Sequence, residues 1–133
     1  MSESARLLRV SDYMTTVPHS IEPHQDLDDA WHMMGKYHVR HLPVLAGGHL
    51  VGLLSERDLT YLRQISGKND KNLRVRDAMV YDPVIVGPEE SLREVARKMA
   101  QERIGSVLVC DARQKLLGIF TYVDALTALA EIT

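Results

Sequence analysis

The chain repeats itself, and this internal duplication constrains its fold more than any other feature of its 133 residues. The stretch VSDYMTTVPHSIEP, which begins at Val10, matches VRDAMVYDPVIVGP, which begins at Val75, without a gap. One additional residue in the later turn DARQK then shifts the offset, so that GLLSERD (52–58) falls on GIFTYVD (118–124). A fixed period of this kind indicates two copies of one structural unit.

Each copy predicts the element order β-α-β-β-α. Short extended segments, HSIEP and PVIVGP, end in proline and precede stretches with apolar residues at helical spacing. Asp26 is the expected N-cap of the first of these helices, and Ser91 with Glu94 forms a capping box at the second. Two hairpins follow, HLPVLAGGHLVGLLS and SVLVCDARQKLLGIFT, which turn at Gly47-Gly48 and Asp111. SERDLTYLRQI and TYVDALTALAEI are the expected closing helices.

The duplication also sets the expected domain organisation, a single module over residues 1–133. Repeat one covers about 8–65, a polar linker covers 66–74, and repeat two covers about 75–131. A half of about 60 residues buries too little apolar surface to be stable alone. We therefore expect an α+β sandwich in which the two sheets pack against each other about a pseudo-twofold axis.

Composition and charge exclude several classes of protein. The chain is 45% hydrophobic and 26% charged, as ordinary globular proteins are, and its net charge of −2 argues against nucleic acid as a partner. No apolar run approaches the roughly 18 residues of a membrane span, and the start MSESARLLRV lacks the apolar core of a secretion signal. We expect a cytoplasmic location, with the single Cys110 as a buried thiol in SVLVC.

Neither a metal site nor an active site is expected. The six histidines are scattered, and only His38 and His41 have helical spacing. The best-placed carboxylates stand at predicted helix starts without an assignable basic partner, whereas an enzyme needs an activated nucleophile or an acid-base pair. We therefore expect a protein that binds and does not catalyse.

GLLSERD and GIFTYVD carry the chemistry of the chain. Ser55 with Asp58, and Thr121 with Asp124, have the spacing of helix caps, and local spacing alone favours capping. A hydroxyl and a carboxylate at a helix start also suit a ligand, and the duplication of the motif favours this second role. The glycines, Gly52 and Gly118, suggest close approach of another backbone.

Taken together, these residues resemble the tandem cystathionine β-synthase (CBS) domain pair, or Bateman module. The resemblance rests on DYMTTVPHSI with DAMVYDPVIV, on VRHLPVL with IGSVLVC, and on the two Gly-x-x-[Ser/Thr]-x-x-Asp stretches. It covers almost the whole chain, from about Val10 to Leu129. Such a resemblance implies a regulatory module that binds adenine nucleotides in clefts between the two copies.

The resemblance also implies two clefts, each completed by the opposite copy. Cleft one joins Thr15, Val17, Val39, Arg40, His41, Pro43, Thr121 and Asp124. Cleft two joins Val80, Val84, Ile104, Gly105, Ser106, Leu108, Ser55, Arg57 and Asp58. A carboxylate suits the two ribose hydroxyls, and a hydroxyl with helix N-terminal N–H groups suits a phosphate. Because Arg40 and His41 match Gly105 and Ser106, we expect the Asp124 cleft to prefer more phosphate charge.

These implications define an expected function with open alternatives. The expected ligand is AMP, ADP or ATP, with Mg²⁺ as a possible companion. Ligand would shift the chain between conformations or states of association that an unknown regulated protein reads. Exposed apolar residues such as Leu126, Leu129 and Ala130 favour a twofold homodimer. Two alternatives stay open: S-adenosylmethionine or another adenosyl ligand, and a protein-interaction scaffold that binds no ligand.

Overall fold

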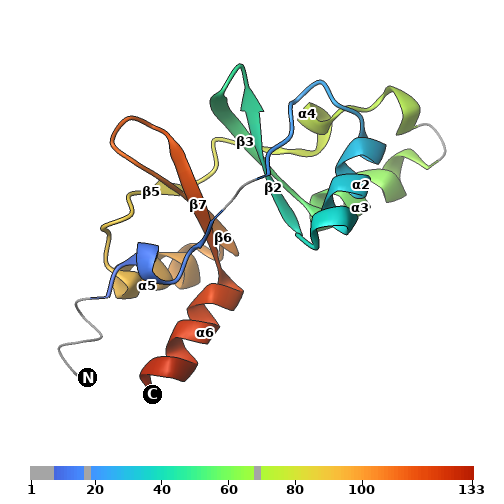
Figure 1. The fold of residues 1–133 in the computed structure, drawn as a ribbon. Coiled ribbons are helices and arrows are strands. Elements are labelled where there is room, and N and C mark those ends of the chain that lie inside the picture. The colour runs from blue at the N-terminus through green and yellow to red at the C-terminus, as the bar shows by residue number, and fades with distance from the viewer. Residues whose placement is uncertain (1–7, 17–18, 68–69) are drawn as a thin grey trace. The chain divides into compact units, whose positions relative to one another are not determined.

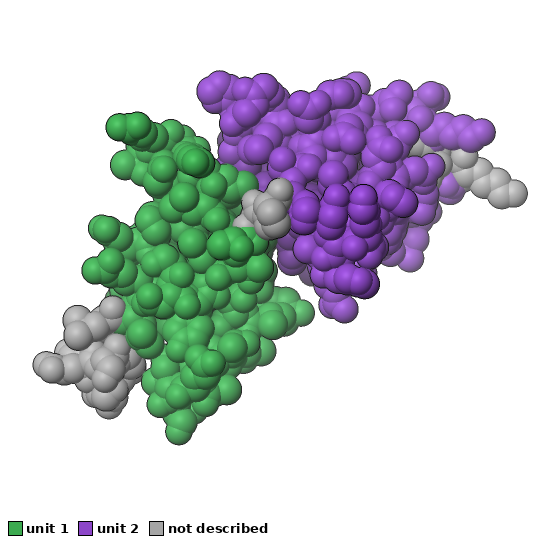
Figure 2. Space-filling model, in the orientation of Figure 1, with its two compact units in different colours: residues 1–17, 84–133 green, residues 18–83 purple. Residues whose placement is uncertain are grey.

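The computed structural model describes residues 8–16, 19–67 and 70–133, which form two compact units (Figures 1 and 2). Unit 1 comprises residues 1–17 and 84–133, and unit 2 comprises residues 18–83. Each unit therefore contains the body of one repeat together with the first segment of the other repeat.

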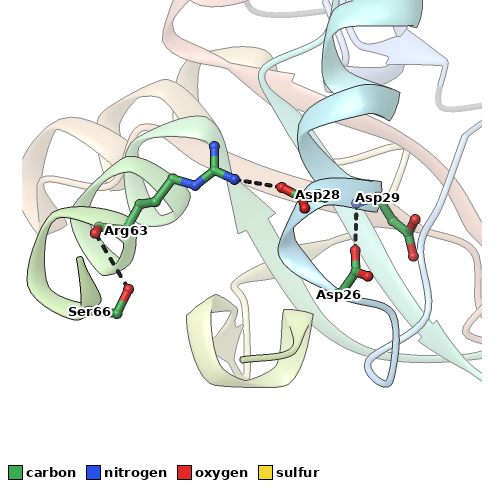
Figure 3. A network of polar contacts seen from close by, with 5 residues as sticks. All are labelled: Asp26, Asp28, Asp29, Arg63 and Ser66. Carbon is green, nitrogen blue, oxygen red and sulfur yellow. Dashed lines mark hydrogen bonds and ion pairs between the residues drawn. The ribbon is translucent and has the colours of Figure 1, made fainter. Parts of the chain in front are cut away.

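Unit 2 is a three-stranded antiparallel sheet with helices. Its elements are α2 (Leu27–Tyr37), β2 (His41–Ala46), β3 (His49–Ser55), α3 (Glu56–Ser66), η2 (Asp70–Asn72), α4 (Val75–Ala78) and β4 (Val80–Tyr81). The strand order is β2-β3-β4. Helices α2 and α3 lie side by side, and Arg63 of α3 donates a hydrogen bond to Asp28 of α2 (Figures 1 and 3).

Unit 1 repeats this plan with a fourth strand. Its elements are η1 (Val10–Asp12), β1 (Thr15–Thr16), β5 (Ile85–Val86), α5 (Leu92–Glu102), β6 (Ser106–Cys110), β7 (Leu116–Thr121) and α6 (Tyr122–Ile132). The strand order is β1-β7-β6-β5, in which β5 and β6 are parallel and the other neighbours are antiparallel.

The first strands of the two repeats are exchanged. Strand β1 of repeat one pairs with β7 of repeat two, and β4 of repeat two pairs with β3 of repeat one. Each exchanged strand pairs with the glycine that begins a Gly-x-x-[Ser/Thr]-x-x-Asp stretch. A Cβ at Gly118 would lie 2.6 Å from the Thr15 carbonyl oxygen, and a Cβ at Gly52 would lie 2.7 Å from Met79 Sδ. The expectation of a close backbone approach at both glycines is confirmed.

The segment before each exchanged strand belongs to the other repeat's core. Val10 and Val75 are fully buried. Val10 packs with residues of α5, β6 and β7, whereas Val75 packs with residues of α2, β2 and β3. Equivalent backbone bonds fix both segments, because Val10 N–H donates to Glu90 O at 2.9 Å and Val75 N–H donates to Gln25 O at 2.8 Å. The exchange therefore contributes to both hydrophobic cores.

The predicted α+β fold with two sheets is confirmed, and so are its principal local signals. Asp26 caps α2 by accepting from Asp29 N–H (Figure 3), and Ser91 caps α5 by accepting from Glu94 N–H. Gly47 and Gly48 have the positive φ of a tight hairpin turn, at 56° and 84°. The packing of one sheet on the other stays a prediction.

One predicted strand is shorter than expected. The segment PVIVGP forms β5, but HSIEP contributes only Ile21, which forms a single parallel bridge with Val44. In repeat two, Leu108 N–H donates to Val84 O at 2.9 Å. Its counterpart in repeat one is Pro43, which has no N–H to donate. Repeat one therefore lacks the hydrogen bond that would extend this strand.

Within residues 8–16, 19–67 and 70–133, no helix combines the length and the apolar character needed to cross a bilayer.

Candidate functional site

Each motif places its hydroxyl residue at the end of a strand and its aspartate in the first turn of the following helix. Ser55 ends β3 and precedes α3, and its Oγ accepts a hydrogen bond from Asp58 N–H at 3.0 Å. Thr121 ends β7 and precedes α6, and its Oγ1 accepts from Asp124 N–H at 3.4 Å. The capping role predicted from local spacing is therefore confirmed for both hydroxyls.

In unit 1 the Asp124 carboxylate is already engaged by the protein. Its Oδ2 accepts from Thr121 N–H at 2.9 Å and from the Thr121 hydroxyl at 3.2 Å. Its Oδ1 accepts from the Thr15 hydroxyl at 3.1 Å. Thr15 lies 109 residues away in the sequence and reaches Asp124 because β1 pairs with β7. Three residues predicted for cleft one thus lie together in this unit.

In unit 2 the corresponding Asp58 carboxylate is open. Within the described residues it accepts no hydrogen bond and forms no ion pair. Burial lowers the pKa of the neighbouring His41 below its ordinary 6.5, and this effect outweighs the opposing influence of the Asp58 carboxylate. His41 is therefore held toward its neutral form.

Two arginines and His41 lie near the start of α3 in unit 2. His41 pairs with Ser55 across the sheet, and Arg40 O accepts from Glu56 N–H at 2.8 Å. Arg57 occupies the first turn of α3, and both arginines are exposed. Unit 1 has Gly105, Ser106 and Val123 at the matching positions. At these matching positions, arginine side chains therefore occur in unit 2 alone.

The strand segments predicted to face a purine enter both sheets by the same turn. Helices α2 and α5 end at His38 and Arg103, which have left-handed backbone conformations with φ of 55° and 57°. The next residue in each repeat donates back to the helix at 3.0 Å, Val39 to Met34 O and Ile104 to Met99 O. This shared turn fixes where residues 39–41 and 104–106 leave the helices.

The predicted clefts draw their residues from both units. Unit 1 contains Thr15, Thr121 and Asp124 of cleft one and Val84, Ile104, Gly105, Ser106 and Leu108 of cleft two. Unit 2 contains Val39, Arg40, His41 and Pro43 of cleft one and Ser55, Arg57, Asp58 and Val80 of cleft two. Val17 lies outside the described residues. The joining of these halves into two clefts stays a prediction.

Sequence reasoning missed one aromatic neighbour of the predicted site. Tyr122 N–H donates to Gly105 O at 3.0 Å, and a Cβ at Gly105 would lie 3.9 Å from the Tyr122 ring. Its side chain is 54% exposed and is therefore available to a ligand. The tyrosine is visible inside the TYVD stretch, but its nearness to Gly105 depends on the pairing of β6 with β7.

Other candidate chemistry is not supported by the described residues. Cys110 is buried, as predicted, and burial raises the pKa of its thiol, which opposes nucleophilic character. The described part of the chain has no group of three or more histidine, cysteine, aspartate or glutamate residues arranged to hold a metal ion. The two helix starts therefore remain the best candidates for function.

Comparison with known proteins identifies the family. The CBS domain family matches the chain twice, over residues 10–64 and 75–131. The chain belongs to the CBS domain family. The two matches confirm the resemblance to a CBS pair, with one copy of the domain in each repeat.

Relatives of this CBS pair include both short proteins and parts of large enzymes. The CBS domain-containing protein YhcV of Bacillus subtilis is 31% identical over 115 residues, which are 86% of this chain and 81% of YhcV. CBSX2, a protein of Arabidopsis thaliana, has been solved in complex with AMP. That structure has a TM-score of 0.77 and 30% identity to this CBS pair, and the match covers 93% of this chain and 97% of the other.

The enzyme relatives match over a small part of their length. The inosine-5'-monophosphate dehydrogenase of Korarchaeum cryptofilum is 30% identical over 105 residues, which are 79% of this CBS pair but only 21% of the dehydrogenase. The shared part is therefore the CBS pair itself. A ligand-sensing role for this chain fits its similarity to these relatives.

Proposed function

We propose that this CBS pair is a regulatory module that binds an adenine nucleotide through Asp58 and Asp124 and acts by binding, without catalysis. The observation that carries the proposal is the match, over nearly the full length of both chains, to a CBS protein solved with AMP. The duplicated helix starts support it, because each has an aspartate and a hydroxyl at the N-terminus of a helix.

The chemistry of each helix start suits a nucleotide. A carboxylate accepts hydrogen bonds from both ribose hydroxyls, and its charge strengthens them. The helix N-terminus and the exposed guanidinium groups of Arg40 and Arg57 favour the phosphates. In the predicted clefts, Arg40 serves Asp124 and Arg57 serves Asp58, so each cleft receives one arginine from unit 2. This distribution favours AMP, ADP or ATP over an uncharged nucleoside.

Calorimetric titration with AMP, ADP, ATP, NAD and S-adenosylmethionine tests the proposal, with and without Mg²⁺. Asp58→Ala and Asp124→Ala should each remove one class of sites. Asp29→Ala is the matched control. Asp29 is also the third residue of a helix, and its N–H also donates to the capping side chain, but it lies on α2. Asp29→Ala should bind like the wild type.

The outcomes separate the alternatives. If Asp58→Ala and Asp124→Ala bind nucleotide as the wild type does, the aspartates are structural and the site assignment is wrong. Binding of S-adenosylmethionine alone would replace the nucleotide by another adenosyl ligand. If no compound binds to the wild type, the chain is a scaffold and the proposed function is wrong.

The proposed output is a change of association or shape in a homodimer, read by a partner protein. Helix α6 supports this proposal with an exposed apolar stripe that includes Tyr122, Val123, Leu126 and Leu129. Leu126 and Leu129 are 58% and 56% exposed. Leu126→Glu places a charge in the stripe and should shift the chain toward monomer in analytical ultracentrifugation. An unchanged sedimentation coefficient would contradict dimerisation through α6.

A further inference from the structure

The two motif aspartates differ in a way that bears on which of them a ligand reaches first. Asp124 accepts on both carboxylate oxygens, from Thr121 on Oδ2 and from Thr15 on Oδ1. Asp58 accepts on neither oxygen within the described residues. The two sites are therefore unequal before any ligand arrives.

The difference in the hydrogen bonds that Asp124 and Asp58 accept follows from which residues begin the two exchanged strands. Thr15 is the first residue of β1 and pairs with Ile119 of β7. At the corresponding place in unit 2, Val80 begins β4 and pairs with Leu53 of β3. Valine has no hydroxyl, so β4 has no donor for Asp58 where β1 has one for Asp124.

A ribose diol competes for the same oxygens. Two adjacent hydroxyls bind a carboxylate best when each donates to its own oxygen. A carboxylate has about four acceptor sites, and at Asp124 the protein fills three of them: Thr121 N–H and the Thr121 hydroxyl on Oδ2, and the Thr15 hydroxyl on Oδ1. A diol needs two sites, so one donor must leave, and the Thr15 hydroxyl is the donor that takes no part in the capping box of α6. At Asp58 no protein donor has to leave. Binding at Asp124 therefore costs one hydrogen bond that binding at Asp58 does not cost.

We propose that the ribose of a nucleotide must displace the hydrogen bond from the Thr15 hydroxyl to Asp124, here called the Thr15 latch. The Asp58 site, where no such bond has to be broken, therefore fills first. The inference rests on the proposed function, because it assumes that the ligand uses these aspartates. Occupation of Asp124 also releases the side-chain bond between β1 and the start of α6. The second binding event therefore loosens the exchanged strand, and the first does not.

Reciprocal substitutions test the latch with AMP as the probe. Thr15→Val is measured in the Asp58→Ala chain, which retains the Asp124 site, and Val80→Thr is measured in the Asp124→Ala chain, which retains the Asp58 site. Thr15 and Val80 are both exposed, so neither change disturbs a core. Thr15→Val should tighten AMP binding about tenfold, and Val80→Thr should weaken it by a similar factor, as expected for one hydrogen bond to a charged group.

A ligand-free measurement accompanies the titrations. Thr15→Val should speed hydrogen exchange at the β1–β7 amides, because it removes the bond that ties β1 to α6.

Unchanged AMP affinity in Thr15→Val would overturn the latch while leaving the proposed function intact. Weaker binding would also overturn it, because Thr15 would then be a ligand contact. A further outcome is that the wild type binds AMP while both parent chains, Asp58→Ala and Asp124→Ala, do not. The two sites would then not bind independently, and the latch, which requires independent sites, would be wrong. If the wild type also fails, both proposals are wrong.

Discussion

Gly118→Ala tests the strand exchange on which both units depend. The new methyl group would lie 2.6 Å from the Thr15 carbonyl oxygen and 3.0 Å from Met14 Sδ. The closer atom belongs to the backbone, and Cβ atoms essentially never lie within 3.0 Å of a heavy atom outside their own and the adjacent residues. Strand β1 must therefore move away from β7. The expected cost combines overpacking with weakened backbone pairing and amounts to about 2 kcal/mol of unfolding free energy.

Urea denaturation followed by circular dichroism measures this cost. For a urea dependence of roughly 2 kcal/mol per molar, the unfolding midpoint should fall by about 1 M. Gly52→Ala should act similarly in unit 2, where the methyl group would meet Met79 Sδ at 2.7 Å and Val80 O at 2.9 Å.

Gly35→Ala is the matched control for these two substitutions. Gly35 lies within α2, and a Cβ there would meet nothing within 4 Å. Alanine should therefore stabilise the helix by about 0.5 to 1 kcal/mol. A Gly118→Ala chain with the wild-type midpoint would refute the close approach of the β1 backbone to Gly118 of β7.

Three further predictions follow from local features. Burial lowers the pKa of His41 in the folded chain below 6.5, so the unfolded chain takes up the proton more readily. The contribution of the neutral imidazole to the unfolding free energy is therefore complete above about pH 6.5, and it is lost as the pH falls toward the pKa of His41 in the folded chain. His41→Gln should therefore reduce the decline of the urea midpoint between pH 7.5 and 5.5, and an unaltered decline would contradict this. Because Cys110 is buried and its thiol pKa is raised, Ellman's reagent at pH 8 should react slowly with the native chain and rapidly in urea; rapid native reaction would show an accessible thiol. Arg103→Gly should relieve the left-handed backbone at the end of α5 and raise the unfolding free energy by about 0.5 to 1 kcal/mol, and a fall would show that the arginine side chain stabilises this turn.

Local signals in the sequence predicted most of the secondary structure. Asp26 and Ser91 cap the helices for which they were proposed, and Gly47-Gly48 forms the predicted turn. These features depend on a few adjacent residues, so their physics is present in the local sequence. The shortened strand at Ile21 has a cause elsewhere in the chain, the missing N–H of Pro43 in β2, and its effect appears only when the strand partner is known.

The two motifs could be found in the sequence, and the family resemblance grouped Thr15 with Asp124, but the hydrogen bond between these two side chains could not be predicted. Ser55, Asp58, Thr121 and Asp124 were identifiable because the same spacing occurs twice. The bond from Thr15 to Asp124 spans 109 residues. It exists only because β1 pairs with β7, and no local pattern specifies that pairing. The nearness of Tyr122 to Gly105 likewise requires the register of β6 against β7.

The sequence by itself therefore determined the repeat, the hairpins, the caps and the positions of the two motifs, because these features follow from short-range backbone chemistry and from comparison of one copy with the other. Only the tertiary structure decided that the first strands are exchanged. It also decided that Asp124 accepts a hydrogen bond from Thr15, whereas the matching position in β4 is Val80, which has no hydroxyl to donate to Asp58. Contacts between residues far apart in the chain depend on which strands pair, and that choice is made by the packing of whole units.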